Sequence, residues 1–481
     1  MNFAIVRYLI GWMLGIESIF LLLPALTAVI YGEPELPAYL IAAAISLAGA
    51  ALLCHRKPKN TRFYAREGYV TVALCWLILA VIGALPFVLS REIPFFIDAL
   101  FETVSGFTTT GATILGDVEA LSHASMLWRC LTHWVGGMGV LVFMLIVLPL
   151  AGGHTIFLMR AESPGPSVSK MSPHMRDTAT ILYAIYFGLT VLQMILLLIG
   201  GMPFFDAICV SLGTAGTGGF GNWNDSIAHY NSAYLQNVIT VFMILFGINF
   251  SAYFLILTRK FRQAFRIEEI RVYLGVIFVF AGLIAFNVRP MFGSLRESFH
   301  HALFQVASII TTTGFSTVDF DQWPTFSRAL LVLLMFIGAC AGSTGGGIKC
   351  SRILLLGKSV KKELMCLIHP RLVRVNKMDG QRVPHEVMRS INVFVVAYAF
   401  IFILSLLIIS LNCEDLVTCF TSVATTLNNV GPGLSLCGPT CNFGFFPPLS
   451  KGVLIFDMLA GRLELFPMLL LFTPGTWQRN K

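Results

Sequence analysis

The sequence predicts an all-α polytopic membrane protein, in which ten transmembrane helices carry four re-entrant loops around a pseudo-fourfold axis. Three observations lead to this fold class. The chain of 481 residues is 56% hydrophobic and 12% charged, with a mean hydropathy of +0.78, so most of it must lie in hydrocarbon. A Gly/Thr loop recurs four times, each copy after a helix too short to cross a bilayer. The basic residues lie in short loops between apolar runs, which indicates membrane topology rather than nucleic-acid binding.

The first 66 residues hold two apolar segments, at about 4–31 and 36–53, and each is long enough to span the membrane once. No small-residue cleavage site follows the first segment, so we expect a retained helix rather than a signal peptide. A basic patch follows the second segment, and the positive-inside rule places this patch in the cytoplasm. We therefore expect both chain termini in the cytoplasm as well. The patch consists of Arg56, Lys57, Lys59, Arg62 and Arg66.

The remaining chain divides into four repeats, each with a long apolar helix, a short helix, a Gly/Thr loop and a second long helix. We place the repeats at 67–177, 178–266, 267–389 and 390–481. The first long helices are expected at about 69–90, 178–200, 270–288 and 391–411. The short helices are expected at 95–107, 203–213, 298–310 and 415–427. The second long helices are expected at 125–151, 234–257, 328–357 and 452–473.

The short helices must dip into the membrane and return, because about 10 to 14 residues at 1.5 Å each cannot cross about 30 Å of hydrocarbon. Two of them open with similar text, beginning at Pro94 and at Pro203, which indicates duplication. We expect each proline near the first helical position, with Asp98 or Asp206 near the positive end of the helix dipole. Basic residues follow the repeats and acidic residues flank the short helices, so the loops should open outward, where acidic groups would concentrate cations.

The four loops are candidates for an ion filter. Non-helical backbone at membrane depth is tolerated only where it is buried in protein or lines water, and four such segments most economically line one path. Glycine permits dihedrals that turn carbonyl groups toward an axis, where they can replace the hydration shell of a monovalent cation. The alternative is that these runs are turns or small residues that pack helices together. The candidate pairs are Thr110-Gly111, Thr217-Gly218, Thr313-Gly314 and Val430-Gly431, with Thr109, Gly216, Thr312 and Asn429 beside them.

A second Gly-rich stretch, at 338–349, interrupts the second long helix of repeat three. It does not match a phosphate-binding loop, because Ile348 separates Gly347 from Lys349 and Cys350 follows the lysine. So many small residues do not hold a straight helix, so we expect a break below the filter or close helix packing. Its central residues are Gly342, Ser343, Thr344, Gly345, Gly346 and Gly347.

Arg462 lies inside the last apolar segment. A charge there costs a few kcal/mol even on lenient scales, about 2.5 to 3.5 at the centre of a helix, so the side chain should face a bundle interior or water. The alternative is an ion pair with Asp457, with Glu464 or with a neighbouring helix.

These motifs resemble the Trk/Ktr/HKT superfamily of potassium transporters, and within it the TrkH type, which has two extra N-terminal helices before four such repeats. The segments SGFTTTGAT, TGGFG, TTTGFS and LNNVGPG resemble the family's filter, and glycine at all four positions, including Gly111, implies potassium rather than sodium. The resemblance further implies that the 338–349 loop and Arg462 gate the path. It also implies a homodimer that works with a cytosolic TrkA-type nucleotide-binding regulator, for which the basic segment 349–389 is a candidate contact. At His133 the family often has Gln.

Two other classes of function remain as alternatives. A secondary transporter of another monovalent cation or small solute, sodium-coupled or sodium-selective, would need polar side chains at the membrane midplane that these loops do not obviously provide. An enzyme is not expected, because the apolar segments hold no paired acids, histidine cluster or nucleophile constellation. We expect no cofactor, K⁺ as the transported ion, and lipid but no nucleic acid as partners. Channel-like flow and symport would use the same filter, so the sequence does not distinguish between them. Whether two of Cys413, Cys437 and Cys441 form a disulfide on the outer face is also left undecided by the sequence.

Overall fold

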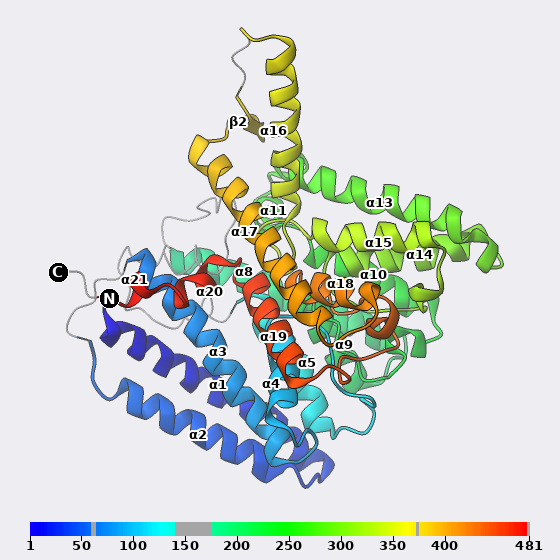
Figure 1. Ribbon diagram of the computed structural model, residues 1–481. Helices are drawn as coiled ribbons and strands as arrows, with labels where there is room; N and C mark the ends of the chain where they lie inside the picture. Colours follow the sequence, from blue (N-terminus) through cyan, green and yellow to red (C-terminus); the bar gives the residue numbers. More distant parts are fainter. Residues whose placement is uncertain (59–63, 140–174, 372–374, 479–481) are drawn as a thin grey trace.

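The computed structural model describes residues 1–58, 64–139, 175–371 and 375–478, and these ranges are almost entirely helical (Figure 1). The two N-terminal helices, α1 (Phe3–Tyr31) and α2 (Leu36–Cys54), pack along each other beside the first repeat. The turn between them uses Gly32 in the left-handed region, with φ 69°, and its N–H closes the helix on the Ala28 carbonyl. Glycine adopts this conformation at little cost, so the chain reverses directly into the second crossing.

Each repeat contains a long first helix and a short re-entrant helix, as predicted. The first helices are α3 (Ala65–Leu89), α8 (Met175–Ile199), α13 (Glu268–Val288) and α17 (His385–Ser410). The short helices are α4 (Phe96–Phe107), α9 (Phe204–Gly216), α14 (Leu295–Ile310) and α18 (Leu416–Leu427). Asp98 and Asp206 lie in the first turn, as expected, but Pro203 is the N-cap residue and Pro94 precedes the N-cap, so neither proline is at the first helical position.

The second helix is broken in repeats two, three and four, and a break was predicted for repeat three alone. Repeat one has α5 (His123–Gly137); repeat two has α10 (Ala233–Phe246) and α11 (Phe250–Leu257), bent by 93°. Repeat three has α15 (Thr325–Ile337) and α16 (Cys350–Ile368), and repeat four has α19 (Pro448–Arg462) and α20 (Phe466–Leu471). The expectation of continuous helices at 234–257 and 452–473 was therefore wrong, and residues 140–151 of the helix expected at 125–151 lie outside the described residues.

The four repeats close into a ring. The second helix of one repeat packs against the short helix of the next: α5 on α9, α10 on α14, α15 on α18, and α19 on α4. The last of these pairs joins the fourth repeat to the first. The four short helices therefore converge on one centre, and their carboxyl ends bring the Gly/Thr loops together.

In the described ranges, six helices are long and apolar enough to span a membrane, and the bent pair of α10 and α11 makes a seventh candidate. The other three predicted crossings coincide with α5, with α15 and α16, and with α19 and α20. The chain is thus a multi-pass membrane protein of the predicted fold class. The boundaries proposed for the repeats stay predictions.

Short elements complete the description. A two-stranded antiparallel hairpin, β1 (Lys377–Met378) and β2 (Gln381–Arg382), lies beside α16, which projects away from the helix bundle (Figure 1). The others are 3₁₀ turns η1 (Ser226–His229), η2 (Arg289–Met291), η3 (Phe320–Gln322) and η4 (Ser435–Cys437), and helices α12 (Phe261–Ala264) and α21 (Pro474–Trp477). All eleven cysteines lie in the described ranges, and none is in a disulfide.

Candidate functional site: a ring of four loops above a broken helix

The four loops share one backbone pattern where the short helices end. In each loop a residue with positive φ is followed, two positions later, by a glycine with positive φ. The residue between them donates its N–H to a carbonyl five residues earlier, at distances of 2.8 to 2.9 Å. These central residues are Thr110, Gly218, Thr313 and Val430. The glycines that follow them are Gly111 (φ 78°), Gly219 (φ 80°), Gly314 (φ 83°) and Gly431 (φ 97°).

This pattern corrects the register predicted for repeat two. Thr217 has φ 55°, like Thr109 and Thr312, and is therefore a neighbour of the filter pair rather than its first member. The pair equivalent to Thr110-Gly111 is Gly218-Gly219, so Gly218 takes the position of a threonine. Gly216, predicted as the neighbour, lies one position further back, in the last turn of α9. An alignment on the residue pair Thr-Gly therefore places the filter pair of repeat two one residue too early.

Two signals in the sequence support the corrected register. Gly219 lies thirteen residues after Asp206, the same interval that separates Gly111 from Asp98. Phe220 follows Gly219 as Phe315 follows Gly314. The distance from the start of the short helix decides the register, because the helix fixes where the loop begins.

The filter glycines are where neighbouring loops touch. A methyl group on Gly111 would overlap the carbonyl oxygen of Gly218, and one on Gly219 would overlap that of Thr313. A methyl on Gly314 would lie 2.5 Å from the Val430 oxygen, and one on Gly431 would lie 2.6 Å from the Thr110 oxygen. Each loop thus rests against the next and the fourth against the first, and these backbone contacts close the ring.

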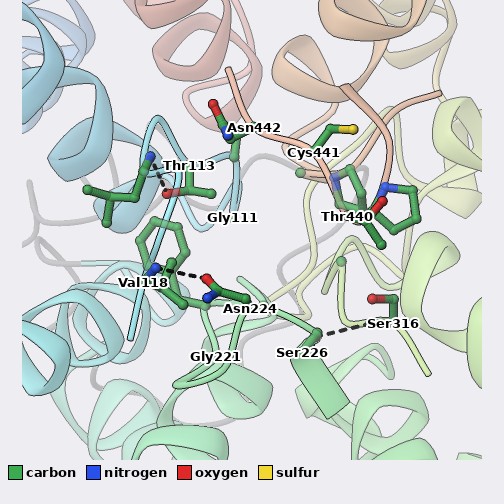
Figure 2. Close-up of a pocket in the computed structure, with 18 of the residues that line it drawn as sticks. Gly111, Thr113, Val118, Gly221, Asn224, Ser226, Ser316, Thr440, Cys441 and Asn442 are labelled. Atoms are coloured by element: carbon green, nitrogen blue, oxygen red, sulfur yellow. Dashed lines mark hydrogen bonds between the residues drawn. The ribbon is translucent and has the colours of Figure 1, made fainter. Parts of the chain in front are cut away.

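A cavity of about 120 Å³ opens on the outer side of this ring. It is lined by all four filter glycines, including Gly219. Figure 2 shows that every repeat contributes to its wall, with Thr113 and Val118 from the first, Asn224 from the second, Ser316 from the third and Cys441 from the fourth. The wall is mostly backbone and small polar groups, which suits a small, partly hydrated ion.

The acidic residues predicted to attract cations have mostly structural partners. Asp98 pairs with Lys451 at 2.6 Å, and the buried Asp206 accepts hydrogen bonds from Asn222, Trp223 and Tyr230. Asp117, which lies on an exposed loop at the rim, is different. A hydrogen bond from the Asn224 amide holds the pKa of its carboxyl below the usual value, so this group stays charged at the mouth.

His133 supports the second loop, a role that the sequence did not reveal. Its buried ring lies where a side chain on Gly218 would stand, and Nδ1 lies 2.7 Å from the Gly106 carbonyl oxygen, to which it donates. The ring also packs on Phe220, with 4.1 Å between ring centroids. The imidazole therefore explains why the threonine of repeats one and three is replaced by glycine in repeat two.

The loop between α15 and α16 lies against the inner side of the ring. Gly346 donates its N–H to Thr312 Oγ1 at 2.7 Å, and a methyl on Gly346 would lie 2.7 Å from the Asn428 oxygen. Thr344 donates to the Phe246 carbonyl at 3.2 Å. Lys349, expected with the cytoplasmic basic residues, instead folds back and donates Nζ to the Gly345 carbonyl. The predicted break is confirmed, and the broken segment sits directly beneath the filter loops.

Glu269, at the start of α13, holds both ends of this loop. Its Oε1 accepts the N–H of Ala341 at 2.7 Å and that of Ser351 at 3.0 Å, and the residue is 2% exposed. A cavity of about 720 Å³ lies beside it, between α11, α13 and the β1–β2 hairpin, and both Ala341 and Ser351 line it. The loop therefore has a fixed anchor and free space next to it.

Arg462 bridges three repeats at the break of the last helix. Nη1 donates to the Thr344 carbonyl at 2.8 Å, and Nη2 donates to the carbonyls of Gly136 and of Gly137, the latter at 2.8 Å. Carbonyls at a helix end attract a cation, which suits the end of α5. The carboxylates proposed as its alternative partners have other contacts: Glu464 pairs with Arg352, and Asp457 accepts from Ser405.

Four re-entrant loops around one path, with helices broken beneath them, define a multi-pass membrane transport protein of the pore-loop class. The chain matches the TrkH family, described as cation transport protein, over residues 37–478, and it belongs to that family. It is therefore a transporter and not an enzyme, and the resemblance seen in the sequence is confirmed.

Individual relatives match along the whole chain. The Trk system potassium uptake protein TrkH of Salmonella typhimurium is 38% identical over 485 residues, covering 99% of this chain and 100% of that one. The Trk system potassium uptake protein TrkG of Escherichia coli is 33% identical over 479 residues, covering 98% of each. A crystal structure of the potassium transporter TrkH from Vibrio parahaemolyticus superposes with a TM-score of 0.90 at 32% identity, covering 99% of this chain and 100% of that one.

Proposed function

We propose that this chain takes up potassium ions across the inner, cytoplasmic membrane, with both termini in the cytoplasm. The observation that carries the proposal is the closed ring in which the Thr110, Gly218, Thr313 and Val430 carbonyls meet the filter glycines. Uncharged oxygen ligands can replace water around a monovalent cation and still release it. The relatives named above, which are potassium uptake proteins, support potassium as the ion.

The proposal includes a gate made of residues 342–347 and Arg462. The loop lies beneath the ring, in contact with Thr312 and Asn428, and a guanidinium at the break of α19 opposes the passage of a cation. Opening then requires the loop to leave Thr312 and Thr344 to leave Arg462.

We also propose a homodimer that works with a cytosolic TrkA-type nucleotide-binding regulator. Segment 349–389 is the candidate contact, because α16 projects from the bundle (Figure 1). This helix also exposes apolar side chains beside basic ones. The exposed apolar residues of α16 are Val360, Leu364, Leu367 and Ile368. Ordinary positive-inside charge would account for the basic residues without any regulator, so the apolar side chains are the more telling feature.

Potassium-limited growth tests the function. A host that lacks its own potassium uptake should grow at low potassium when it expresses this chain, alone or with a regulator, and vesicles that contain the protein should take up rubidium as a tracer. Wild-type protein that gives neither growth nor flux would overturn the proposal.

The gate is tested in the same vesicles. Arg462→Ala should raise flux, because it removes the charge and the contact to Thr344. Arg328→Ala is the matched control, since Arg328 forms a partly exposed ion pair with Asp321 outside the gate. Flux that stays at the wild-type level in Arg462→Ala would remove this residue from the gate.

A further inference from the structure

The mouth of the filter carries a positive charge. Among the described residues that line the outer cavity, Arg129 is the one with a charged side chain, and it is 2% exposed. A cation at the entrance of a cation path repels the ion that must enter, unless a second charge balances it. A cation path therefore needs a group that neutralises Arg129.

Glu102, on the short helix α4, is the balancing group. Its Oε1 accepts the Arg129 Nε–H at 2.8 Å, and the residue is 1% exposed. The same carboxylate accepts the Thr113 hydroxyl at 3.0 Å and the Ile114 N–H at 3.1 Å. These two residues lie two and three positions after Gly111, on the outward side, so Glu102 also fixes the chain as it leaves the first filter loop.

Arg129 extends this contact to the second loop. Its guanidinium lies over the ring of Phe220, 4.1 Å from the centroid, and Phe220 follows the filter residue Gly219. The face of an aromatic ring attracts a cation, which holds the two groups in one geometry. The ion pair thus connects the first two filter loops behind the path.

The other repeats have nothing equivalent at this position. Nine residues before the filter glycine, where repeat one has Glu102, the chain has Val210, Gln305 and Ser422. Gln305 makes a long bond of 3.5 Å to the Val318 carbonyl, and Ser422 donates to the Cys419 carbonyl on its own helix. In the described residues, the ion pair behind the filter therefore belongs to repeat one alone.

We propose that Glu102 is a positioning residue that determines cation affinity and selectivity: it neutralises Arg129 at the mouth and holds filter loops one and two in register. The inference rests on the proposed function, because it assigns these loops to a potassium path. It also predicts the direction of two effects: neutralising Glu102 alone and neutralising Arg129 alone should change ion entry in opposite directions.

The test compares Glu102→Gln, Arg129→Gln and the double variant in reconstituted vesicles, with KM and maximal rate for rubidium uptake and competition by sodium. Glu102→Gln leaves a buried positive charge unpaired at the mouth, and this charge repels an entering cation, so KM should rise about tenfold or more. Arg129→Gln should give a KM no higher than wild type. The double variant should return KM to within about threefold of wild type, because neutral replacement of both partners of a buried pair is tolerated.

Two controls separate this role from a purely structural one. Glu297→Gln removes an exposed acidic charge from the first turn of another short helix, α14, and should leave KM unchanged. Melting temperatures report folding for every variant. The inference is overturned if Glu102→Gln leaves KM and sodium competition unchanged, or if both single variants raise KM and the double variant is no better. Wild-type vesicles without rubidium uptake would instead overturn the proposed function.

Discussion

At the scale of single residues, the buried ring of His133 occupies the space beside Gly218 and fixes the register of the second loop. The sequence suffices to find four loops and the filter glycine of repeats one, three and four, which follows Thr110, Thr313 and Val430. In repeat two the pair Thr-Gly lies one position too early, since Gly218 replaces a threonine to make room for His133. The sequence around Gly218 does not predict the loss of the threonine, because the imidazole belongs to α5, more than eighty residues away in the chain.

The corrected register predicts that Gly219→Ala abolishes rubidium uptake by folded protein. Its methyl group would meet the Thr313 carbonyl, and φ of 80° is strained for alanine, so the loop has to move. Gly221→Ala is the control, because its methyl would find only ordinary contacts at 3.9 Å. Normal uptake by Gly219→Ala would contradict the register.

His133 gives a second prediction at this scale. His133→Ala should lower stability by about 2 to 4 kcal/mol, because it leaves a cavity behind the second loop and frees the Gly106 carbonyl. His133→Gln should lose less, since an amide can still donate to that oxygen. Thermal unfolding in detergent measures both. Equal losses in the two variants would show that the hydrogen bond contributes little.

At the scale of secondary structure, the short helices and one break were predictable, and the other breaks were not. The short helices were found because about a dozen apolar residues cannot span a bilayer, whatever their sequence. The break at 338–349 was found because it is rich in glycine. The breaks after Phe246 and Arg462 involve three residues each and lie between apolar segments. A hydropathy profile therefore predicts one continuous helix at each place. These breaks depend on tertiary contacts such as Phe250 N–H to the Gly342 carbonyl.

The anchoring of the gate loop predicts that Glu269→Ala raises rubidium flux. Without the carboxylate, the N–H groups of Ala341 and Ser351 lose their acceptor, and the loop can move into the adjacent cavity. Glu269→Gln keeps an acceptor oxygen and should stay near wild type. Glu268→Ala is the control for charge, because its carboxylate holds Lys358 instead. Flux in Glu269→Ala at or below the wild-type rate would argue against the anchor.

At the scale of the whole molecule, charge placement predicts the orientation and the four loops predict the path, but the order of the repeats around the axis needed the structure. Sequential order around the ring follows from helix pairs such as α19 on α4, which join residues far apart in the chain. A repeat pattern alone is equally compatible with other orders, because each copy contains the same kinds of surface.

The orientation can be tested with a thiol reagent. Cys441 is the exposed one of the eleven cysteines and lines the outer cavity. A charged reagent that does not cross membranes should therefore reduce rubidium uptake when it is added outside intact cells, and Cys441→Ser should abolish that sensitivity. Inhibition of the wild type only after access to the cytoplasmic side would reverse the assigned orientation.

The contacts that close the ring join unlike surfaces, the second helix of one repeat and the short helix of the next. Such head-to-tail interfaces are the kind that also close rings of separate, identical subunits. With the four units fused in one chain, each interface occurs once and can change independently. Three features each occur in a single repeat: the Glu102–Arg129 pair, the glycine at 218 and Asn429 at the fourth loop. In a tetramer of identical subunits, each of these features would appear four times.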